Sequence, residues 1–468
     1  MDVRKNHPES NGCNAGLGMT FSEYVTMDQE EVNSVDVSIL PAYGECPAQG
    51  LLLCYWNNII GPHAHCVWQI AGKPEFTQEQ LKYLSTHTLT SSDNPASAIN
   101  SKLLFLEDQD AIVHIFLFSG YQRSQKVTFA LSLVIPFQLK DWYLSVHSFC
   151  EMRLTSMVRR LRVLQEKYKS EENSPAIQAF SAKVPDFLRS ITRLSNFGLP
   201  KKIELNDTVF ASGQDKHLDV QFMRKAIAGH LQSCGCSVVI GNSVAEINMV
   251  LFTLALFLTP SERQYSLRLT KDSSQFPFKY EADVQLQGFL KTSFEVEDSL
   301  LSIMASRYPT SLVDLTTLEV KQMYHYNEHE YMRHEVITKE LQHTWLESKE
   351  PIPVLRFSKE IETDTLVENF QKEMYMLNPE GGVREAFLLH FARLLDRKAL
   401  LLIKYVEDET HRGKYPFKVS VRKLKADLDL TPDGNFRIVI AHAEKLQPGI
   451  YSMVCGSLAV RGRDILEV

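Results

Sequence analysis

The chain has 468 residues, of which 44% are apolar and 23% are charged, and its formal net charge is −7. This composition excludes wholesale disorder, collagen-like repeats and disulfide scaffolds, and the length predicts about three domains. The acidic balance argues against nucleic-acid binding, and the 8 cysteines without an apolar leader predict free thiols in a reducing compartment.

The first elements predicted are a tail and a small α/β domain. Residues 1–45 are rich in Asn, Ser, Gly and acidic side chains, which predicts a disordered tail. A small α/β domain is predicted over 46–170. It opens with a hairpin, in which Leu51–Trp56 and His65–Ile70 form the strands and Asn57–Pro62 forms the turn.

A short helix, three strands and a long helix complete this domain. Thr77 is a suitable N-cap for the short helix. Apolar residues alternate along Val127–Ile135, as expected for a strand with one buried face. The long helix has an apolar stripe from Tyr143 to Tyr168. We expect its basic face to lie in solvent, with an acidic partner or a membrane as the alternative. That face carries Arg153, Arg159, Arg160, Arg162 and Lys167.

Residues 171–215 are predicted to form a linker with one helix, near 176–195, and residues 216–350 a central α/β domain. The central domain is expected to contain a helix near Leu218–Gln232 and a strand at Ser237–Ile240. Further strands are expected near 283–290 and 311–315.

An apolar helix follows the first central strand. A capping box at Ser243–Glu246 is expected to begin it and Pro260 to end it. Its apolar run, Val250–Leu258, is shorter than the roughly 20 residues of a membrane span, so we expect a core helix and no direct membrane insertion. Residues 351–468 are predicted to be helical, with a second capping box at Thr365–Glu368.

The sequence offers few candidates for chemistry. It has no P-loop, nucleophile elbow or kinase motif set. His325–His329 fits the H-x-x-E-H pattern, so a zinc hydrolase is a distant alternative. Without a clear third ligand, we predict that this segment is a solvated helix face. We therefore predict neither a metal nor a cofactor.

Two further groups of histidine or cysteine residues are expected to be structural. His63 and His65 should share one face of a strand while Cys66 points the other way, which opposes a common metal site. Cys234 and Cys236 are expected to be buried free thiols beside a core strand.

Several segments resemble the DENN family. The segments that carry this resemblance are Tyr55-Trp56-Asn57-Asn58-Ile59-Ile60-Gly61-Pro62, Cys234-Gly235-Cys236-Ser237-Val238-Val239, Leu256-Phe257-Leu258-Thr259-Pro260-Ser261-Glu262-Arg263, Arg397-Lys398-Ala399-Leu400-Leu401-Leu402-Ile403-Lys404-Tyr405-Val406-Glu407-Asp408-Glu409-Thr410 and Leu424-Lys425-Ala426-Asp427-Leu428-Asp429-Leu430-Thr431. The resemblance runs from about residue 50 to the end. It implies a longin-like α/β module, a mixed α/β DENN core (cDENN) and a helical C-terminal portion (dDENN).

The resemblance also implies a function. DENN proteins of this kind regulate Rab- or Arf-type small GTPases in autophagy and endolysosomal traffic, without catalytic chemistry of their own. It implies a second DENN-type protein as heterodimer partner and a WD-repeat adaptor. The chain would be cytoplasmic and recruited to lysosomes, endosomes or autophagosomes through these partners. It would act as an exchange factor, or as a scaffold subunit of an activating complex whose catalytic arginine lies on the partner.

The candidate contact residues lie in two loops on a rigid scaffold. The first loop contributes Trp56, Asn57, Asn58, Ile59, Gly61 and Pro62, and the second contributes Arg123. We expect both loops to face a GTPase or a partner. An arginine finger at Arg123 is a less favoured reading than a solvated side chain. An exposed strand of the same domain is expected to extend a partner's sheet.

Overall fold

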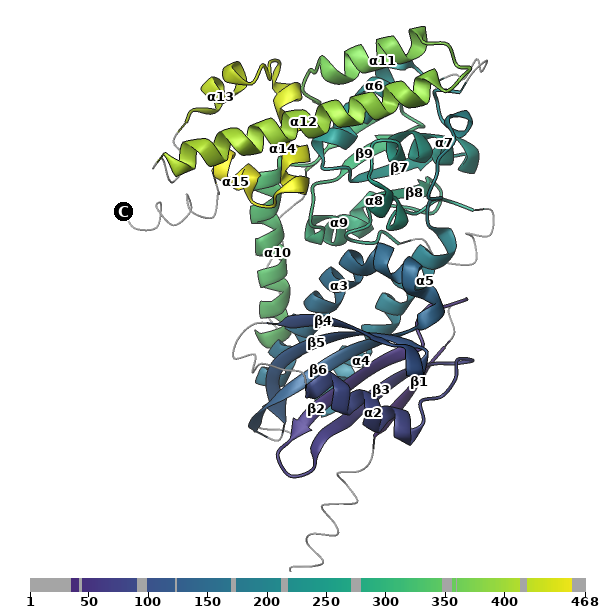
Figure 1. Cartoon of the computed structure of the whole chain (residues 1–468), viewed down its shortest axis with the longest axis vertical. Coiled ribbons are helices and arrows are strands. Elements are labelled where there is room, and N and C mark those ends of the chain that lie inside the picture. The colour runs from purple at the N-terminus through teal and green to yellow at the C-terminus, as the bar shows by residue number, and fades with distance from the viewer. Residues whose placement is uncertain are drawn as a thin grey trace, which may run out of the picture.

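The computed structural model describes residues 35–41, 44–90, 99–122, 124–169, 174–211, 218–270, 279–346, 356–358, 360–412 and 419–456. Figure 1 shows a six-stranded sheet at one end of the molecule, a four-stranded sheet in the middle and a group of helices at the other end. The predicted α/β class with a helical C-terminal portion is confirmed.

The front module is built on the six-stranded sheet, whose strand order is β1-β3-β2-β6-β5-β4. Its strands are β1 (Asp36–Leu40), β2 (Gly50–Asn57), β3 (Gly61–Ile70), β4 (Asn100–Leu106), β5 (Ala111–Gln122) and β6 (Gln125–Pro136). β1 pairs in parallel with β3, whereas the other neighbours are antiparallel. The predicted hairpin and the three later strands are all present.

β1 corrects the prediction of a disordered tail. Residues 36–40 form a strand against Cys66–Ile70, so the tail prediction is wrong for this segment. Residues 1–34 and 42–43 lie outside the described residues. This strand is hard to predict because it buries no apolar face of its own, with Val37 and Ile39 both exposed, and its position depends on backbone pairing with a distant segment.

Helices cover both faces of this sheet. α2 (Gln78–Leu89) packs on one face. Thr77 is its N-cap, as predicted, and forms a capping box with Gln80. α3 (Lys140–Lys167) packs on the other face through the predicted apolar stripe. Each large apolar side chain buried there contributes about 1.5–3 kcal/mol.

The predicted linker contains two helices, α4 (Ser174–Ser181) and α5 (Val184–Phe197), where one was expected. Both contribute to the core beneath α3. The Trp68 indole N–H of β3 donates to Ser181 Oγ at 2.9 Å, which fixes α4 to the sheet. This segment is therefore part of the front module's packing.

The central sheet has the order β10-β9-β7-β8, and β7 is parallel to both of its neighbours. Its strands are β7 (Ser237–Gly241), β8 (Leu286–Leu290), β9 (Ser311–Asp314) and β10 (Glu319–Gln322). The helices around it are α6 (Val220–Gln232), α7 (Val244–Ala255), α8 (Pro260–Gln264), α9 (Val296–Ala305) and α10 (Tyr326–Leu346). Residues on both faces of β7 are buried, as its short apolar sequence predicts.

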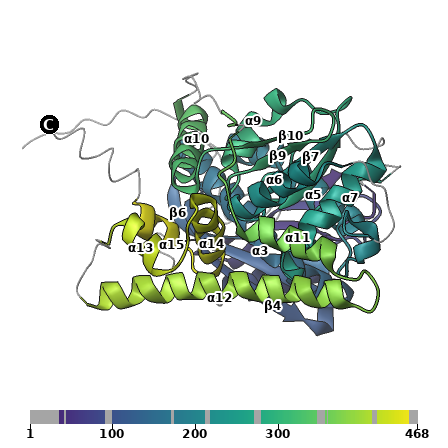
Figure 2. The ribbon, with the colours of Figure 1, turned by 90° about the horizontal axis from the view of Figure 1, so that it is seen from above.

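The C-terminal helices are α11 (Leu366–Met376), α12 (Val383–His411), α13 (Val421–Asp427), α14 (Asp433–Leu446) and α15 (Ile450–Cys455). Figure 2 shows α12 running along one side of the molecule, with α11 beside one half of it and α13 to α15 beside the other. No helix within the described ranges is long and apolar enough to cross a membrane.

Three predicted helix ends differ in detail. Ser243 and Thr365 occupy the N-cap positions of α7 and α11, but neither side chain makes the capping hydrogen bond. Asp364 Oδ1 accepts from Val367 N instead, at 2.7 Å. Pro260 does not end α7, which stops at Ala255; it is the first residue of α8.

Candidate functional site

The β2–β3 turn carries most of the predicted contact residues. Asn57 Oδ1 accepts hydrogen bonds from the backbone N–H groups of Ile59, at 2.8 Å, and Ile60, at 3.3 Å. Gly61 closes the turn with a φ of 83°, which a glycine adopts without strain. An asparagine that bonds the backbone ahead of it is a common way to fix a turn. The tip is therefore held by its own residues.

Large apolar side chains project from this turn. Trp56 is 38% exposed, Ile59 94% and Ile60 43%. Single exposed apolar residues are common, but three within five positions form a small apolar surface. We call Trp56, Ile59 and Ile60 the hairpin tip.

The β3 edge beside the hairpin tip is open in the described part of the chain. β1 pairs with Cys66–Ile70 and does not reach Gly61–His65. An open strand edge can accept a strand from another protein. Pro62, which has no N–H group, limits how many hydrogen bonds this edge can donate. The hairpin tip thus lies next to a short, partly blocked strand edge.

Two histidines flank Tyr55 behind the hairpin tip. The ring centroids of His63 and His65 lie 5.6 Å and 5.5 Å from that of Tyr55. Burial, together with a smaller effect of the neighbouring His63, lowers the pKa of His65 to about 4. The prediction that the two histidines share one face of the strand is confirmed, but the prediction that Cys66 lies on the opposite face is wrong. A β-bulge between Leu53 and Cys54 places Cys66 in the core that contains Tyr55.

Arg123 lies outside the described residues, so its predicted role stays a prediction. Its neighbours Gln122 and Gln125 pair at the end of β5 and β6. β6 also pairs with β2, with Phe129 opposite Tyr55. The β5–β6 turn and the hairpin tip are therefore at the same end of the sheet.

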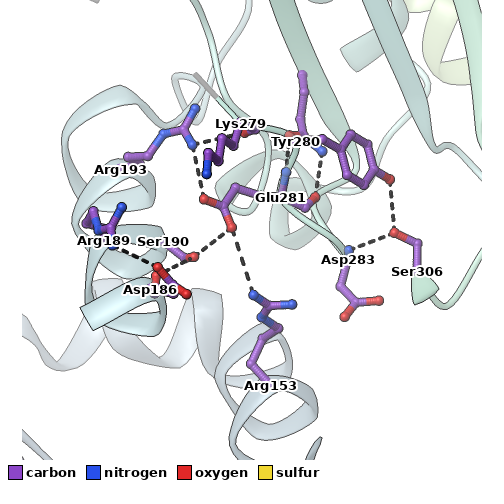
Figure 3. A network of polar contacts seen from close by, with 11 residues as sticks. Arg153, Asp186, Arg189, Ser190, Arg193, Lys279, Tyr280, Glu281, Asp283 and Ser306 are labelled. Carbon is purple, nitrogen blue, oxygen red and sulfur yellow. Dashed lines mark hydrogen bonds and ion pairs between the residues drawn. The ribbon is translucent and has the colours of Figure 1, made fainter. Parts of the chain in front are cut away.

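A polar network at the junction of the front module and the central domain was missed by the sequence analysis. At its centre is Glu281, in the segment before β8. Its Oε1 accepts from Arg193 Nη1 at 3.0 Å, and its Oε2 accepts from Ser190 Oγ at 2.7 Å. Arg153 Nη2 of α3 lies 3.9 Å from the same Oε2. Figure 3 shows these side chains converging on Glu281 from α3 and α5.

This junction is well shielded from solvent. The side chain of Arg193 is 7% exposed and that of Glu281 is 14% exposed. Burial lowers the pKa of the Arg193 guanidinium, while the Glu281 carboxylate opposes that shift. The Glu281 backbone is held by Gln287, which accepts from its N–H at 2.9 Å and donates to its carbonyl at 2.7 Å. The arrangement fixes α5 against the central domain.

The basic face of α3 was expected to lie in solvent, but much of it contacts α10. Arg160 forms an ion pair with Glu340 of α10, and Lys167 Nζ donates to the Thr344 carbonyl at 3.1 Å. Of the basic residues on this face, Arg159 is exposed, and the others are partly buried. α3 therefore binds the sheet with one face and the central domain with the other. The sequence did not indicate this interface because the partners of Arg160 and Lys167 lie more than 100 positions further along the chain.

We compared the chain with known proteins. It matches the model of the C9orf72-like protein family over residues 80–329. It is 33% identical over 466 residues to the Homo sapiens protein named "Guanine nucleotide exchange factor C9orf72", covering 90% of this chain and 95% of that protein. The Mus musculus homolog is also 33% identical, with the same coverage.

The chain belongs to the C9orf72-like protein family. The segment that matches the family, residues 80–329, includes Arg153, Arg193 and Glu281 but begins after the hairpin tip. The longer alignments to the mammalian proteins cover most of the remaining chain.

The histidine motif of this C9orf72-like chain does not form the site that the H-x-x-E-H pattern suggested. His325 precedes α10 and is exposed, whereas His329 is buried and its Nε2 lies 2.8 Å from the Ser306 carbonyl. The prediction of a solvated face is wrong for His329. Cys234 and Cys236 are buried free thiols, as predicted. No group of three or more metal-ligating residues is found in the described part of the chain.

Proposed function

We propose that this chain is a guanine nucleotide exchange factor for a small GTPase of the Rab or Arf type, acting in autophagy and endolysosomal traffic. The observation that carries the proposal is the match, over 90% of the chain, to a human protein named as a guanine nucleotide exchange factor. Such a regulator acts on the GTPase's own nucleotide site and needs no catalytic group of its own.

The mechanism requires a surface that binds the nucleotide-free GTPase more tightly than the nucleotide-bound form. Binding then shifts the population toward the open state and weakens the contacts to Mg²⁺ and phosphate. The hairpin tip suits such a surface because its backbone is fixed by Asn57 and its apolar side chains are already exposed. Apolar anchors on a preorganised turn bind with little loss of conformational entropy.

The proposal includes a heterodimer with a second DENN-type protein, and a WD-repeat adaptor that recruits the cytoplasmic complex to lysosomes, endosomes or autophagosomes. Three edges of the six-stranded sheet support strand pairing with a partner: the edge strands β1 and β4, and the part of β3 at Gly61–His65 that β1 does not reach. The two faces of this sheet, by contrast, are packed against α2 and α3.

Release of a fluorescent guanine nucleotide from a panel of Rab and Arf proteins tests the proposal, with and without the partner. We expect faster release from at least one GTPase. Ile59→Asp should abolish the acceleration. Met376→Asp should not, because Met376 is also highly exposed, at 84%, but lies at the end of α11, away from the front sheet. Unchanged release across the whole panel would refute the exchange function.

A second candidate function is a scaffold that supports a GTPase-activating complex, with the catalytic arginine on the partner. The exposed hairpin tip and the open β3 edge at Gly61–His65 are surfaces on which a partner could be held in this role. It predicts that removing the chain lowers the partner's stability while the partner's isolated rate of GTP hydrolysis stays the same. A hydrolysis assay on the partner alone and on the complex separates the two functions.

A further inference from the structure

A cavity lies at the junction between the front module and the central domain. Its volume is about 200 Å³, and α3, α5, α9 and the segment before β8 contribute to its wall. Since a water molecule occupies about 30 Å³ in the liquid, the cavity has room for several waters or for one phosphate group and part of its ester. Figure 3 shows most of its charged residues around Glu281.

The charges of the wall favour an anion. The cationic residues are Arg153, Arg189, Arg193 and Lys279, and the carboxylates are Asp186 and Glu281. Four positive and two negative side chains leave a net charge of two positive units. The Glu281 oxygens are occupied by Arg193 and Ser190, and the Asp186 carboxylate by Arg189 at 2.7 Å. The excess therefore resides on the remaining two cations.

Those two cations are poorly neutralised among the described residues. Arg153 has a single ion-pair contact there, at 3.9 Å from Glu281, which is too long for a hydrogen bond. Lys279 is exposed and has no ion pair with a described residue. Arg153 comes from the front module and Lys279 from the central domain, so an anion between them would contact both parts of the molecule.

We propose that this cavity binds a ligand with a phosphate group in its dianionic form, through Arg153 and Lys279. A phosphate dianion matches the two excess positive charges of the wall. Its oxygens can accept the paired N–H groups of Arg153 from one side and the ammonium of Lys279 from the other. The ligand is either inorganic phosphate or a phosphate monoester, and it would add a bridge between the front module and the central domain.

Isothermal titration of the full-length chain tests this inference without any GTPase, so the result is independent of the proposed exchange function. Inorganic phosphate and glycerol 3-phosphate are titrated separately at constant ionic strength. Saturable binding of one ligand is expected, and the tighter of the two identifies the source. No saturable binding of either ligand would overturn the proposal.

Charge-removing variants locate the site. Arg153→Gln and Lys279→Gln should each weaken binding about tenfold, as expected for loss of one charge-assisted contact. Arg159→Gln on the same helix and Lys225→Gln on α6 are matched controls, because both residues are exposed and outside the cavity. Equal weakening in the controls, or unchanged affinity in both test variants, would overturn the assignment. Lys279→Gln keeps the test valid if Arg153→Gln impairs folding, since Lys279 is exposed.

Discussion

Glu281→Gln is the most informative single change to the fold. It keeps the shape of the side chain and removes the charge that faces Arg193 across 3.0 Å. Breaking a buried ion pair by removing one partner costs about 3–5 kcal/mol, because the other charge is left uncompensated. Here the Lys279 carbonyl still accepts from Arg193 Nη1, at 3.1 Å, and glutamine retains an acceptor oxygen. We therefore expect a loss of about 2–3 kcal/mol in the free energy of unfolding.

Thermal unfolding and peptide-level hydrogen exchange of the full chain measure this effect. Exchange should accelerate in α5 and in the residues that lead into β8, since Glu281 joins these two segments. Asp408→Asn is the matched control: it removes a carboxylate from the solvent-exposed pair with Lys404 on α12, where no resolvable change is expected.

Two outcomes would refute this reasoning. One is a Glu281→Gln variant as stable as the wild type. The other is a loss of stability with faster exchange spread evenly over the chain, which would mean that Glu281 does not act at the junction.

Three further predictions concern separate parts of the molecule. Ile59→Asp should leave the unfolding midpoint unchanged while weakening partner or GTPase capture in a pull-down, because its side chain is almost fully exposed; a lowered midpoint would contradict this. Burial lowers the pKa of His230 to about 3 and of His329 to about 4, so the unfolded state binds more protons below pH 6.5. Stability should fall as the pH drops from 6.5 toward 4, by about 1 kcal/mol per histidine at pH 5.5; His329→Gln should flatten this slope in denaturant titrations, and an unchanged slope would count against it. Gly434→Ala would force its Cβ against the Thr363 carbonyl oxygen, so chemical unfolding should show a loss of about 1–3 kcal/mol in the free energy of unfolding, and a variant of wild-type stability would be inconsistent with this close approach.

Sequence reasoning succeeded where the signal is local. The Thr77 cap and the stripe that begins at Tyr143 depend on neighbours three or four residues away, and both are present in the structure. The hairpin was recognised for the same reason, since Gly61 and the flanking apolar strands are adjacent in the chain.

It failed where a residue's environment is set by a distant segment. Arg160 looks solvated from its own helix, but Glu340 lies 180 positions further on. Glu281 resembles any surface carboxylate until α5 is packed against it. Cys66 was assigned to the wrong face because one extra residue in β3 reverses the alternation, and a β-bulge of this kind has no distinctive sequence pattern.

α10 has a consequence for how the molecule responds to its partners. Its 21 residues make a rod of about 30 Å. Near its C-terminal end, Glu340 and Thr344 contact α3 of the front module, whereas near its start Tyr326 donates to Glu444 of α14 at 3.0 Å. Figure 1 shows it spanning from the six-stranded sheet to the C-terminal helices. A partner that displaces the front sheet would therefore also shift the C-terminal helices, because α10 connects the two as one rigid helix.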